Sequence, residues 1–235
     1  MREKQIRRSS KSKKFEVFEH FFNASFGNGT FFGPFNFQST ISNTNAGIQL
    51  PVGTATNPGI LRLLSGTVAS SSSTGSRTSI NTAPGSIVAG SGDLELEFVY
   101  KPTVVATQAN DYEFFLGFGD SVSGSPANGA FIYFDWNTTP PNLQCVTRDS
   151  STGASPAPST VAISQATTQT LNWTKCNIKI PKSRASAIFT FNDTDVVTIN
   201  TAVPLNTAIQ FTFRKFNGTQ NEGLDLDYVK FVYSL

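Results

Sequence analysis

The stretch DLELEFVY at residues 93–100 alternates apolar and polar side chains along its length. One face carries Leu94, Leu96, Phe98 and Tyr100, and the other carries Asp93, Glu95, Glu97 and Val99. A period of two residues is that of a β-strand with one face in a hydrophobic core. The stretch therefore predicts a half-buried strand, and other strands must supply the rest of that core.

Short stretches of the same kind recur along most of the chain. They are GIQLPV (47–52), GILRLLSG (59–66), SRTSIN (76–81), YEFFLGFGD (112–120), GAFIYFDW (129–136), NLQCVTRD (142–149), NWTKCNIKIP (172–181), SAIFTFND (186–193), VVTIN (196–200), IQFTFRKF (209–216) and LDLDYVKFVY (224–233). FNDTD (191–195) predicts a tight hairpin turn, because Asn and Asp tolerate the left-handed backbone of such turns. Many short strands without helical periodicity predict an antiparallel sandwich or barrel.

The composition agrees with one large all-β domain. The 235 residues are 38% hydrophobic and 14% charged, and they include 21 Phe. These values describe a folded, weakly charged chain that is long enough to bury a substantial core. Cys145 and Cys176 lack the spacing of metal ligands. We expect two buried, reduced thiols, with a disulfide between neighbouring strands as the alternative.

Residues 224–233, LDLDYVKFVY, raise the question of whether two aspartates on one strand form an active site. Asp225 and Asp227 have no histidine or recognisable metal triad to work with. We therefore expect a packed strand in which Leu226 and Tyr228 seal one sheet and Asp227 bonds a loop or a neighbouring backbone group.

Residues 1–14, MREKQIRRSSKSKK, form a basic segment. Seven basic side chains stand against Glu3, a net charge of +6, so the rest of the chain carries −4 of the total of +2. Such a segment does not bury enough apolar surface to fold alone, and it suits an acidic protein groove, nucleic acid or an anionic membrane surface. The alternative is a solvated, disordered terminus. We predict that residues 1–30 form an arm that anchors the chain, and that 31–235 form the folded domain. The expected partner-binding residues are Arg2, Lys4, Arg7, Arg8, Lys11, Lys13, Lys14, Phe15, Phe18, Phe21 and Phe22.

The order of several short motifs resembles that of a known group of domains. The motifs are NPGILRLLSGT (57–67), ELEFVYKP (95–102), FFLGFGDSVSGSPANGAFIYFDW (114–136), VTRD (146–149), NWTKCNIKI (172–180) and LDLDYVKF (224–231). Together they resemble the concanavalin-like (LamG-like) jelly-roll domains of tailed-bacteriophage virion proteins. The resemblance covers roughly residues 30–235. It implies an all-β, antiparallel two-sheet jelly-roll sandwich, here with an extended basic N-terminal arm.

The resemblance also implies a function. It predicts a non-enzymatic structural component of the virion, such as a head decoration protein, a fibre or a tail appendage. The arm would bind capsid or tail subunits, the jelly roll would be exposed, and a homo-oligomer such as a trimer is expected. The alternative is a host-attachment module that binds bacterial surface polysaccharide. Fold alone does not decide between these roles. No membrane span and no cofactor are expected.

Glycan binding would need aromatic rings beside polar groups that fix hydroxyls. The candidates are Tyr133, Asp135, Trp136 and Asn137. Phe131 and Tyr133 share one face of their strand and Phe134 and Trp136 the other, so whichever face points inward is core.

Catalysis and metal binding are the remaining alternatives. Asp93, Glu95 and Glu97 share one strand face, as do the carboxylates of some retaining glycosidases, but solvent-facing acids need no catalytic explanation. The single histidine, His20, and the absence of a GxSxG motif argue against a serine hydrolase. Asp120, Asp135 and Asn137 offer oxygen atoms to calcium, although turn formation explains them equally well. We expect no enzyme activity and no metal.

Overall fold

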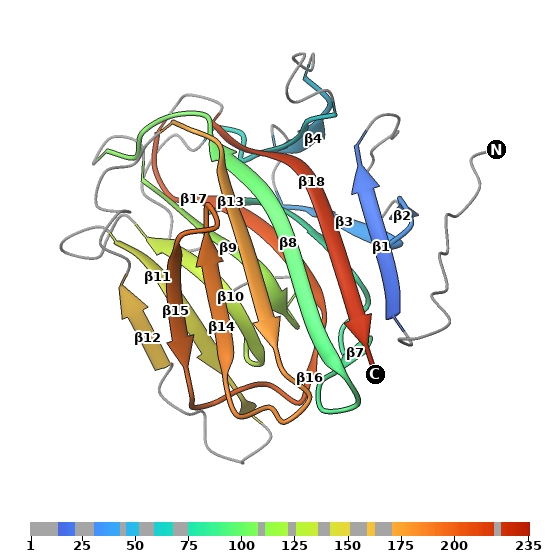
Figure 1. Ribbon diagram of the computed structural model, residues 1–235. Helices are drawn as coiled ribbons and strands as arrows, with labels where there is room; N and C mark the ends of the chain where they lie inside the picture. Colours follow the sequence, from blue (N-terminus) through green and yellow to red (C-terminus); the bar gives the residue numbers. More distant parts are fainter. Residues whose placement is uncertain are drawn as a thin grey trace.

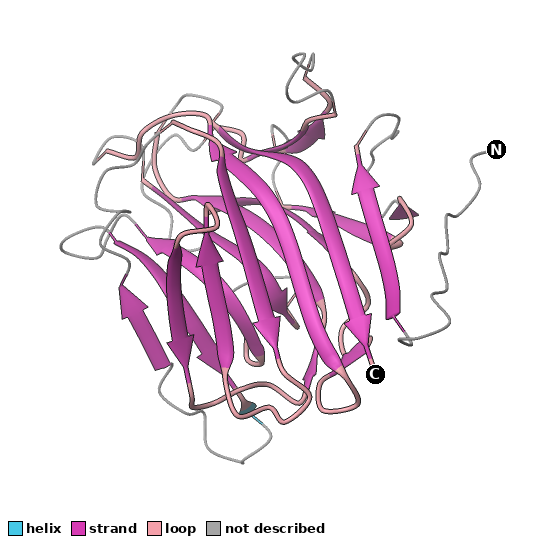
Figure 2. Cartoon of the chain, viewed as in Figure 1, coloured by secondary structure: helices cyan, strands magenta, loops and turns pink. Residues whose placement is uncertain are grey.

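Two antiparallel β-sheets face each other across a shared core (Figure 1). The computed structural model describes residues 14–21, 31–42, 46–51, 59–67, 75–107, 111–121, 126–135, 142–150, 159–162, 171–218 and 222–235. Within these ranges the chain forms strands and connecting loops, as Figure 2 shows, with no α-helix and with Ser150 alone in a 3-10 conformation. The all-β, antiparallel two-sheet jelly roll predicted from the sequence is confirmed.

Sheet A contains the alternating stretch with which the sequence analysis began. Its order is β15 (Asp195–Ile199), β14 (Ala187–Phe191), β13 (Thr174–Ile180), β8 (Asp93–Pro102), β18 (Gly223–Ser234), β5 (Leu61–Leu64) and β4 (Gly47–Gln49), and β1 (Lys14–His20) also pairs with β18. The predicted turn at 191–195 joins β14 to β15, with Asn192 and Asp193 at φ of 49° and 63°. That prediction is confirmed.

Sheet B lies behind sheet A in Figure 1 and carries the candidate glycan-binding strand. Its order is β12 (Ser159–Ala162), β11 (Asn142–Arg148), β10 (Gly129–Asp135), β9 (Tyr112–Gly119), β17 (Ile209–Lys215), β6 (Ser76–Asn81), β3 (Phe37–Ile41) and β2 (Phe31–Phe32). A short additional pair joins β16 (Asn206–Thr207) to β7 (Ile87–Val88).

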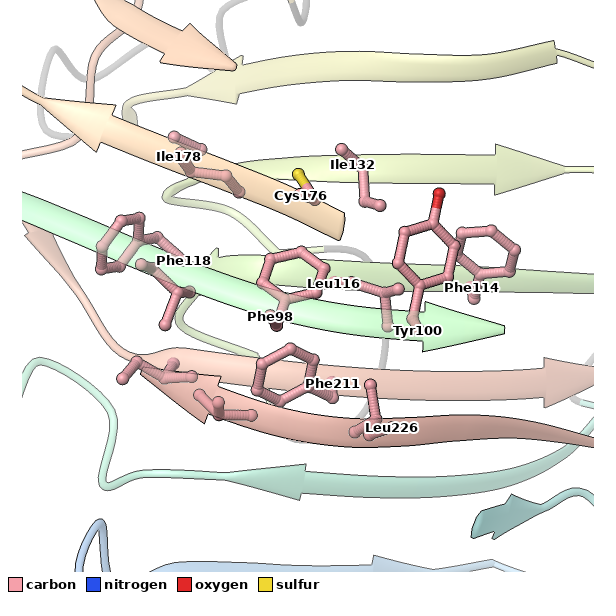
Figure 3. Packing of buried hydrophobic residues seen from close by; sticks show 14 of the residues in the cluster. Phe98, Tyr100, Phe114, Leu116, Phe118, Ile132, Cys176, Ile178, Phe211 and Leu226 are labelled. Carbon is pink, nitrogen blue, oxygen red and sulfur yellow. The ribbon is translucent and has the colours of Figure 1, made fainter. Parts of the chain in front are cut away.

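The core fills the space between the sheets with aromatic side chains from both (Figure 3). Phe98 of β8 meets Phe211 of β17 edge to face at 5.2 Å between ring centroids, and Tyr100 meets Phe114 of β9 at 5.8 Å. Aromatic pairs prefer such tilted arrangements, which add to the stabilisation from burial. Phe-rich strands with a period of two residues thus explain why the two layers pack.

The cysteines lie in this core on opposite sheets. Cys145 of β11 and Cys176 of β13 are both buried and free, and Figure 3 shows the sulfur of Cys176 among the core side chains. The prediction of two buried, reduced thiols is confirmed. Burial raises the pKa of both thiols, so neither is a reactive thiolate.

The terminal strand β18 departs from the predicted pattern at a β-bulge. Its register against β8 shifts between Leu226 and Val229, so both of these residues face the core. Tyr228 turns outward, and its hydroxyl donates a hydrogen bond of 2.7 Å to Glu97 Oε1. The prediction that Leu226 and Tyr228 share a face is wrong, because the extra residue in the bulge reverses the alternation. Asp225 forms an ion pair with Arg62, as a structural residue does.

Part of the predicted arm belongs to sheet A. Lys14–His20 forms β1 and pairs with the C-terminal half of β18, and Phe21 is buried in the core. Phe15 and Phe18 are each 42% exposed. Arg2, Lys4, Arg7, Arg8, Lys11, Lys13 and Phe22 lie outside the described residues. The boundary predicted between residues 30 and 31 therefore stays a prediction.

Candidate functional site

A row of charged side chains crosses the outer face of sheet B where β6, β17, β9 and β10 run side by side. The strand registers place Arg77 opposite Arg214, Arg214 opposite Glu113, and Glu113 opposite Asp135. Tyr133 lies two residues before Asp135 on the same face. These five residues, Arg77, Arg214, Glu113, Asp135 and Tyr133, are called the outer-face cluster below.

The Tyr133 hydroxyl joins the two carboxylates of the cluster. It lies 2.8 Å from Asp135 Oδ2 and 3.3 Å from Glu113 Oε2. Burial raises the pKa of Tyr133, and the two nearby carboxylates raise it further. The phenol therefore stays protonated. Because its hydroxyl has a single proton, it donates a full hydrogen bond to only one of the two carboxylates at a time. Asp135 is the closer acceptor, and its side chain is only half buried.

Glu113 is the buried acid of the cluster. The residue is 6% exposed, and Arg214 Nη1 lies 3.0 Å from its Oε1. Burial raises the pKa of Glu113, while Arg214 opposes the shift. The ion pair thus offsets part of the cost of keeping a carboxylate out of water.

Arg214 is held in place by more than its carboxylate. Its guanidinium lies 4.3 Å from the centre of the Phe216 ring, a cation–π contact. The arginine chain also lies against Gly75, where an added Cβ would meet Arg214 Nε at 3.0 Å. Gly75 also has a φ of +63°, a backbone conformation that favours glycine. The guanidinium is therefore fixed by the fold before any ligand arrives.

An aromatic stack supports the cluster from within the same face. The Phe115 and Tyr133 rings are nearly parallel, at 15°, with centroids 4.8 Å apart. Phe115, Phe131 and Val146 form a small cluster of their own, separate from the main core. Phe134, by contrast, points inward and is 3% exposed. The face shared by Phe131 and Tyr133 is thus the outer one, which the sequence left open.

The structure brings together two of the four predicted glycan-binding residues. Tyr133 and Asp135 are hydrogen-bonded to each other, whereas Trp136 and Asn137 lie outside the described residues. Sequence reasoning missed Glu113, Arg214 and Arg77. Only Arg214 stands on the polar side of an alternating strand, whereas Glu113 shares its strand face with Phe115 and Arg77 lies in a mostly polar stretch. The register that aligns the three comes from the fold.

The calcium hypothesis for Asp120, Asp135 and Asn137 does not fit the geometry. Asp120 follows Gly119, which pairs with Gly129, whereas Asp135 lies at the other end of the β9–β10 hairpin. At about 3.4 Å per residue the two aspartates are roughly 20 Å apart. The Asp120 carboxylate instead accepts hydrogen bonds from the amides of Ala127 and Asn128. It forms the loop, which was the other interpretation of this residue.

The acidic stretch of β8 on sheet A has structural partners. Glu95 Oε1 accepts a hydrogen bond from Asn177, and Glu97 accepts one from Tyr228 and lies 3.7 Å from Lys175 Nζ. Asp93 accepts the amide of Lys182. These contacts support solvated, cross-strand pairs and not a catalytic pair. Among the described residues, no group of three or more His, Cys, Asp or Glu side chains is placed to hold a metal ion.

Comparisons with known proteins bear on the fold. No protein-family model and no curated protein matches the sequence. Among solved structures, the carbohydrate recognition domain of Emp47p has a TM-score of 0.58 and 10% identity, over 94% of this chain and 95% of that one. A seed lectin of Lotus tetragonolobus has a TM-score of 0.50 and 11% identity, over 94% and 99%.

A third similar structure is the binding domain of botulinum neurotoxin DC in complex with rat synaptotagmin II. Its TM-score is 0.51 with 11% identity, over 85% of this chain and 44% of that one. The chain therefore has a lectin-like, concanavalin-like fold. Identities this low show the fold alone, and the predicted relation to phage virion proteins stays a prediction. No described segment is a helix long and apolar enough to cross a membrane.

Proposed function

We propose that this chain is a non-enzymatic carbohydrate-binding module that binds a glycan at the outer-face cluster of sheet B. The observation that carries the proposal is the Tyr133 hydroxyl held between Asp135 and Glu113 on a ring stacked against Phe115. Tyr133 is half-buried and Phe115 behind it is 3% exposed, so a sugar would meet the tyrosine and the polar groups that orient its hydroxyls.

The polar groups are arranged for recognition. Asp135 is an acceptor at the half-buried rim, and Arg214 is a donor fixed by Glu113 and Phe216. Acceptors and donors on adjacent strands are what vicinal hydroxyls of a sugar require. Groups that are already held in position lose little conformational freedom on binding, which favours affinity.

The same arrangement speaks against glycoside hydrolysis. In a glycosidase two carboxyl groups flank the bond to be broken, with space for the sugar between them. Here the carboxylates of Glu113 and Asp135 are bridged by the Tyr133 hydroxyl, and Arg214 neutralises Glu113. The fold shared with the carbohydrate recognition domain of Emp47p and with a seed lectin supports binding without catalysis.

A matched pair of variants tests the proposal. Tyr133→Phe removes the bridging hydroxyl on sheet B, and Tyr228→Phe removes a hydroxyl that bonds Glu97 on sheet A. On a glycan array, we expect the whole chain to bind and Tyr133→Phe to lose roughly tenfold or more in affinity. Tyr228→Phe should bind as the unmodified chain does. Equal losses in both variants, or no binding by the unmodified chain, would contradict the proposal.

The role in a phage particle is the second candidate, with the chain as a structural component anchored by its N-terminal arm. The exposed rings of Phe15 and Phe18 on β1, next to the basic segment, support it. We expect deletion of residues 1–13 to abolish attachment to phage particles, and full attachment without them to contradict the role. The trimer, capsid or tail partners and location in the virion stay predictions.

A further inference from the structure

A lysine and a glutamate face each other inside the sandwich. Lys215 is the last residue of β17 in sheet B, and Glu222 immediately precedes β18 in sheet A. Lys215 Nζ lies 3.0 Å from Glu222 Oε2, and the two side chains are 0% and 1% exposed. The amine and the carboxyl group are therefore in contact at one end of the core, where both are removed from bulk solvent.

The sheet holds Lys215 in position from both sides. Its backbone pairs with Ser76 of β6 and with Tyr112 of β9. Both neighbours are buried, and the Tyr112 ring packs against that of Phe213, with 5.0 Å between the centroids. A residue between two paired strands has little backbone freedom, so the lysine side chain starts from a fixed point and extends into the core.

The backbone at Glu222 is held as firmly. Its carbonyl oxygen accepts hydrogen bonds from the amide of Ser65 at 3.0 Å and from the hydroxyl of Ser65 at 3.1 Å. The next residue, Gly223, forms two hydrogen bonds of 2.9 Å with Thr103. Within the part of the chain that the structure describes, neither carboxylate oxygen of Glu222 has a hydrogen-bond partner. The carboxyl group thus lies against an amine without the hydrogen bonds that stabilise a buried carboxylate.

Burial disfavours the charged form of this acid. It raises the pKa of Glu222, while Lys215 opposes the shift. A buried ion pair recovers its desolvation cost only where further hydrogen bonds satisfy the charged groups. Movement of one proton over the 3.0 Å between Nζ and Oε2 gives a neutral amine beside a neutral carboxylic acid. These are the two forms that react to give an amide.

We propose that Lys215 and Glu222 condense to an intramolecular amide, which joins sheet B to sheet A by a covalent bond after the chain has folded. One proton first moves from the Lys215 ammonium to the Glu222 carboxylate. The Nζ lone pair then attacks Cδ, the bond from Cδ to the hydroxyl breaks, and the hydroxyl leaves with one amine proton as water. The product is a neutral amide in place of two buried charges, and no oxidant or other reactant is consumed.

Proximity and burial favour this reaction. Groups that are held in contact react as if at a concentration of roughly 10⁵–10⁸ M. Hydrolysis of the amide would need water at side chains that are 0% and 1% exposed, so the product is protected once it has formed. The inference is independent of glycan binding, because both residues lie inside the sandwich and the outer-face cluster does not.

Intact-mass spectrometry of the whole chain tests the inference. We expect the folded chain, kept at neutral pH, to weigh less than its sequence by the mass of one water molecule. Digestion with trypsin locates the bond, because a lysine in an amide is no longer a cleavage site. The expected product is a peptide of residues 215–230 that lacks one water and gives no backbone fragment ions between Lys215 and Glu222.

Two controls assign the loss of water to this buried pair. Lys175 Nζ lies 2.7 Å from Asp193 Oδ1 on sheet A, but their side chains are 30% and 70% exposed. Trypsin should therefore cleave after Lys175 in the same sample. Lys215→Arg keeps a positive charge opposite Glu222 and presents a guanidinium, which stays protonated and is no nucleophile. This variant should retain the full mass of its sequence.

The unmodified chain decides the question even if Lys215→Arg does not fold. A folded chain that keeps its full sequence mass and is cleaved after Lys215 would overturn the inference. So would a loss of water that maps to other residues or that also occurs in Lys215→Arg. A chain kept in urea throughout should not react, and an equal loss of water there would show that the fold does not bring about the reaction.

Discussion

Each outer face of the sandwich carries a phenylalanine ring stacked on a tyrosine whose hydroxyl lies near a glutamate. The two stacked pairs differ in how deeply they are buried. On sheet B, Phe115 stacks on Tyr133 at 4.8 Å, and the tyrosine hydroxyl lies within hydrogen-bond distance of Glu113. On sheet A, Phe18 stacks on Tyr228 at 5.2 Å, and that hydroxyl bonds Glu97. Phe115 is 3% exposed, whereas Phe18 is 42% exposed.

The charged side chains beside the two stacked pairs also differ in their exposure to solvent. On sheet A, Lys175 lies between Glu97 and Asp193, with its side chain 30% exposed and that of Asp193 70% exposed. Such solvated pairs contribute little to stability. On sheet B, the Glu113 side chain is 8% exposed, and burial raises the pKa of its carboxyl while Arg214 opposes that shift. We infer that the face of sheet A is ordinary surface and that the face of sheet B is a built site.

Truncation of the two phenylalanines gives the largest expected difference. Phe115→Ala should lower the free energy of unfolding by about 3–4 kcal/mol, because it leaves a cavity under Tyr133. Phe18→Ala should lower it by about 1 kcal/mol or less, because much of that ring is already in water. Urea unfolding followed by tryptophan fluorescence measures both. Similar losses would remove the contrast on which the assignment of the site depends.

Removal of the acidic partners should give a smaller difference of the same sign. Glu113→Ala leaves Arg214 without its carboxylate in a half-buried position, and we expect a loss of about 2 kcal/mol. Glu97→Ala removes a half-buried carboxylate that pairs with Lys175 and accepts the Tyr228 hydroxyl, and it should cost about 1 kcal/mol. The control is double substitution with Arg214→Met, which should recover part of the Glu113→Ala loss. No recovery would mean that Glu113 acts on stability independently of its ion pair.

The smallest expected effect is a change of stability with pH that depends on a partly buried glutamate of β1. Glu19, whose carboxylate lies against Gly33, has a pKa raised by burial from 4.5 to about 7. The folded chain binds this proton more tightly than the unfolded chain, so the stability it contributes at acid pH is lost as pH rises from about 4.5 to about 7. Since the group is only partly buried, we expect a loss of about 1 kcal/mol.

Urea midpoints at pH 4.5 and pH 7.5 measure this loss, and Glu19→Gln should abolish it. Glu16 lies on the opposite face of β1, where a hydrogen bond from Lys14 lowers its pKa. Glu16→Gln is therefore the matched control and should retain the decline in stability toward pH 7.5. An unchanged pH dependence in Glu19→Gln would show that another group is responsible.

Alternation of side chains was enough to predict most strands and their class. The stretch at 93–100 appears as most of β8, because its apolar residues at every second position are buried and its acidic residues are not. It was not enough where one residue breaks the alternation. The bulge in β18 turns Tyr228 outward, and no local pattern in LDLDYVKFVY marks it.

Charged residues show a second property that the sequence pattern does not predict, namely which distant side chains become their partners. Lys215 stands on the apolar parity of β17 and is fully buried, because Glu222, seven residues later, lies 3.0 Å away. The outer-face cluster joins Arg77 to Arg214, which are more than a hundred residues apart in the chain. Such neighbours follow from strand order, and strand order follows from packing across the whole sandwich. Tyr133 and Asp135 were predictable because they share one short strand.

The claim that sheet B carries the binding site is tested most directly by nuclear magnetic resonance. A glycan that binds on the array is titrated into the isotope-labelled chain, and backbone amide shifts are followed. The expected result is that shifts gather at residues 113–115, 133–135 and 212–216 and that β8 and β13 are unaffected. Shifts confined to β8, β13 and β18 would place the ligand on sheet A and contradict the claim.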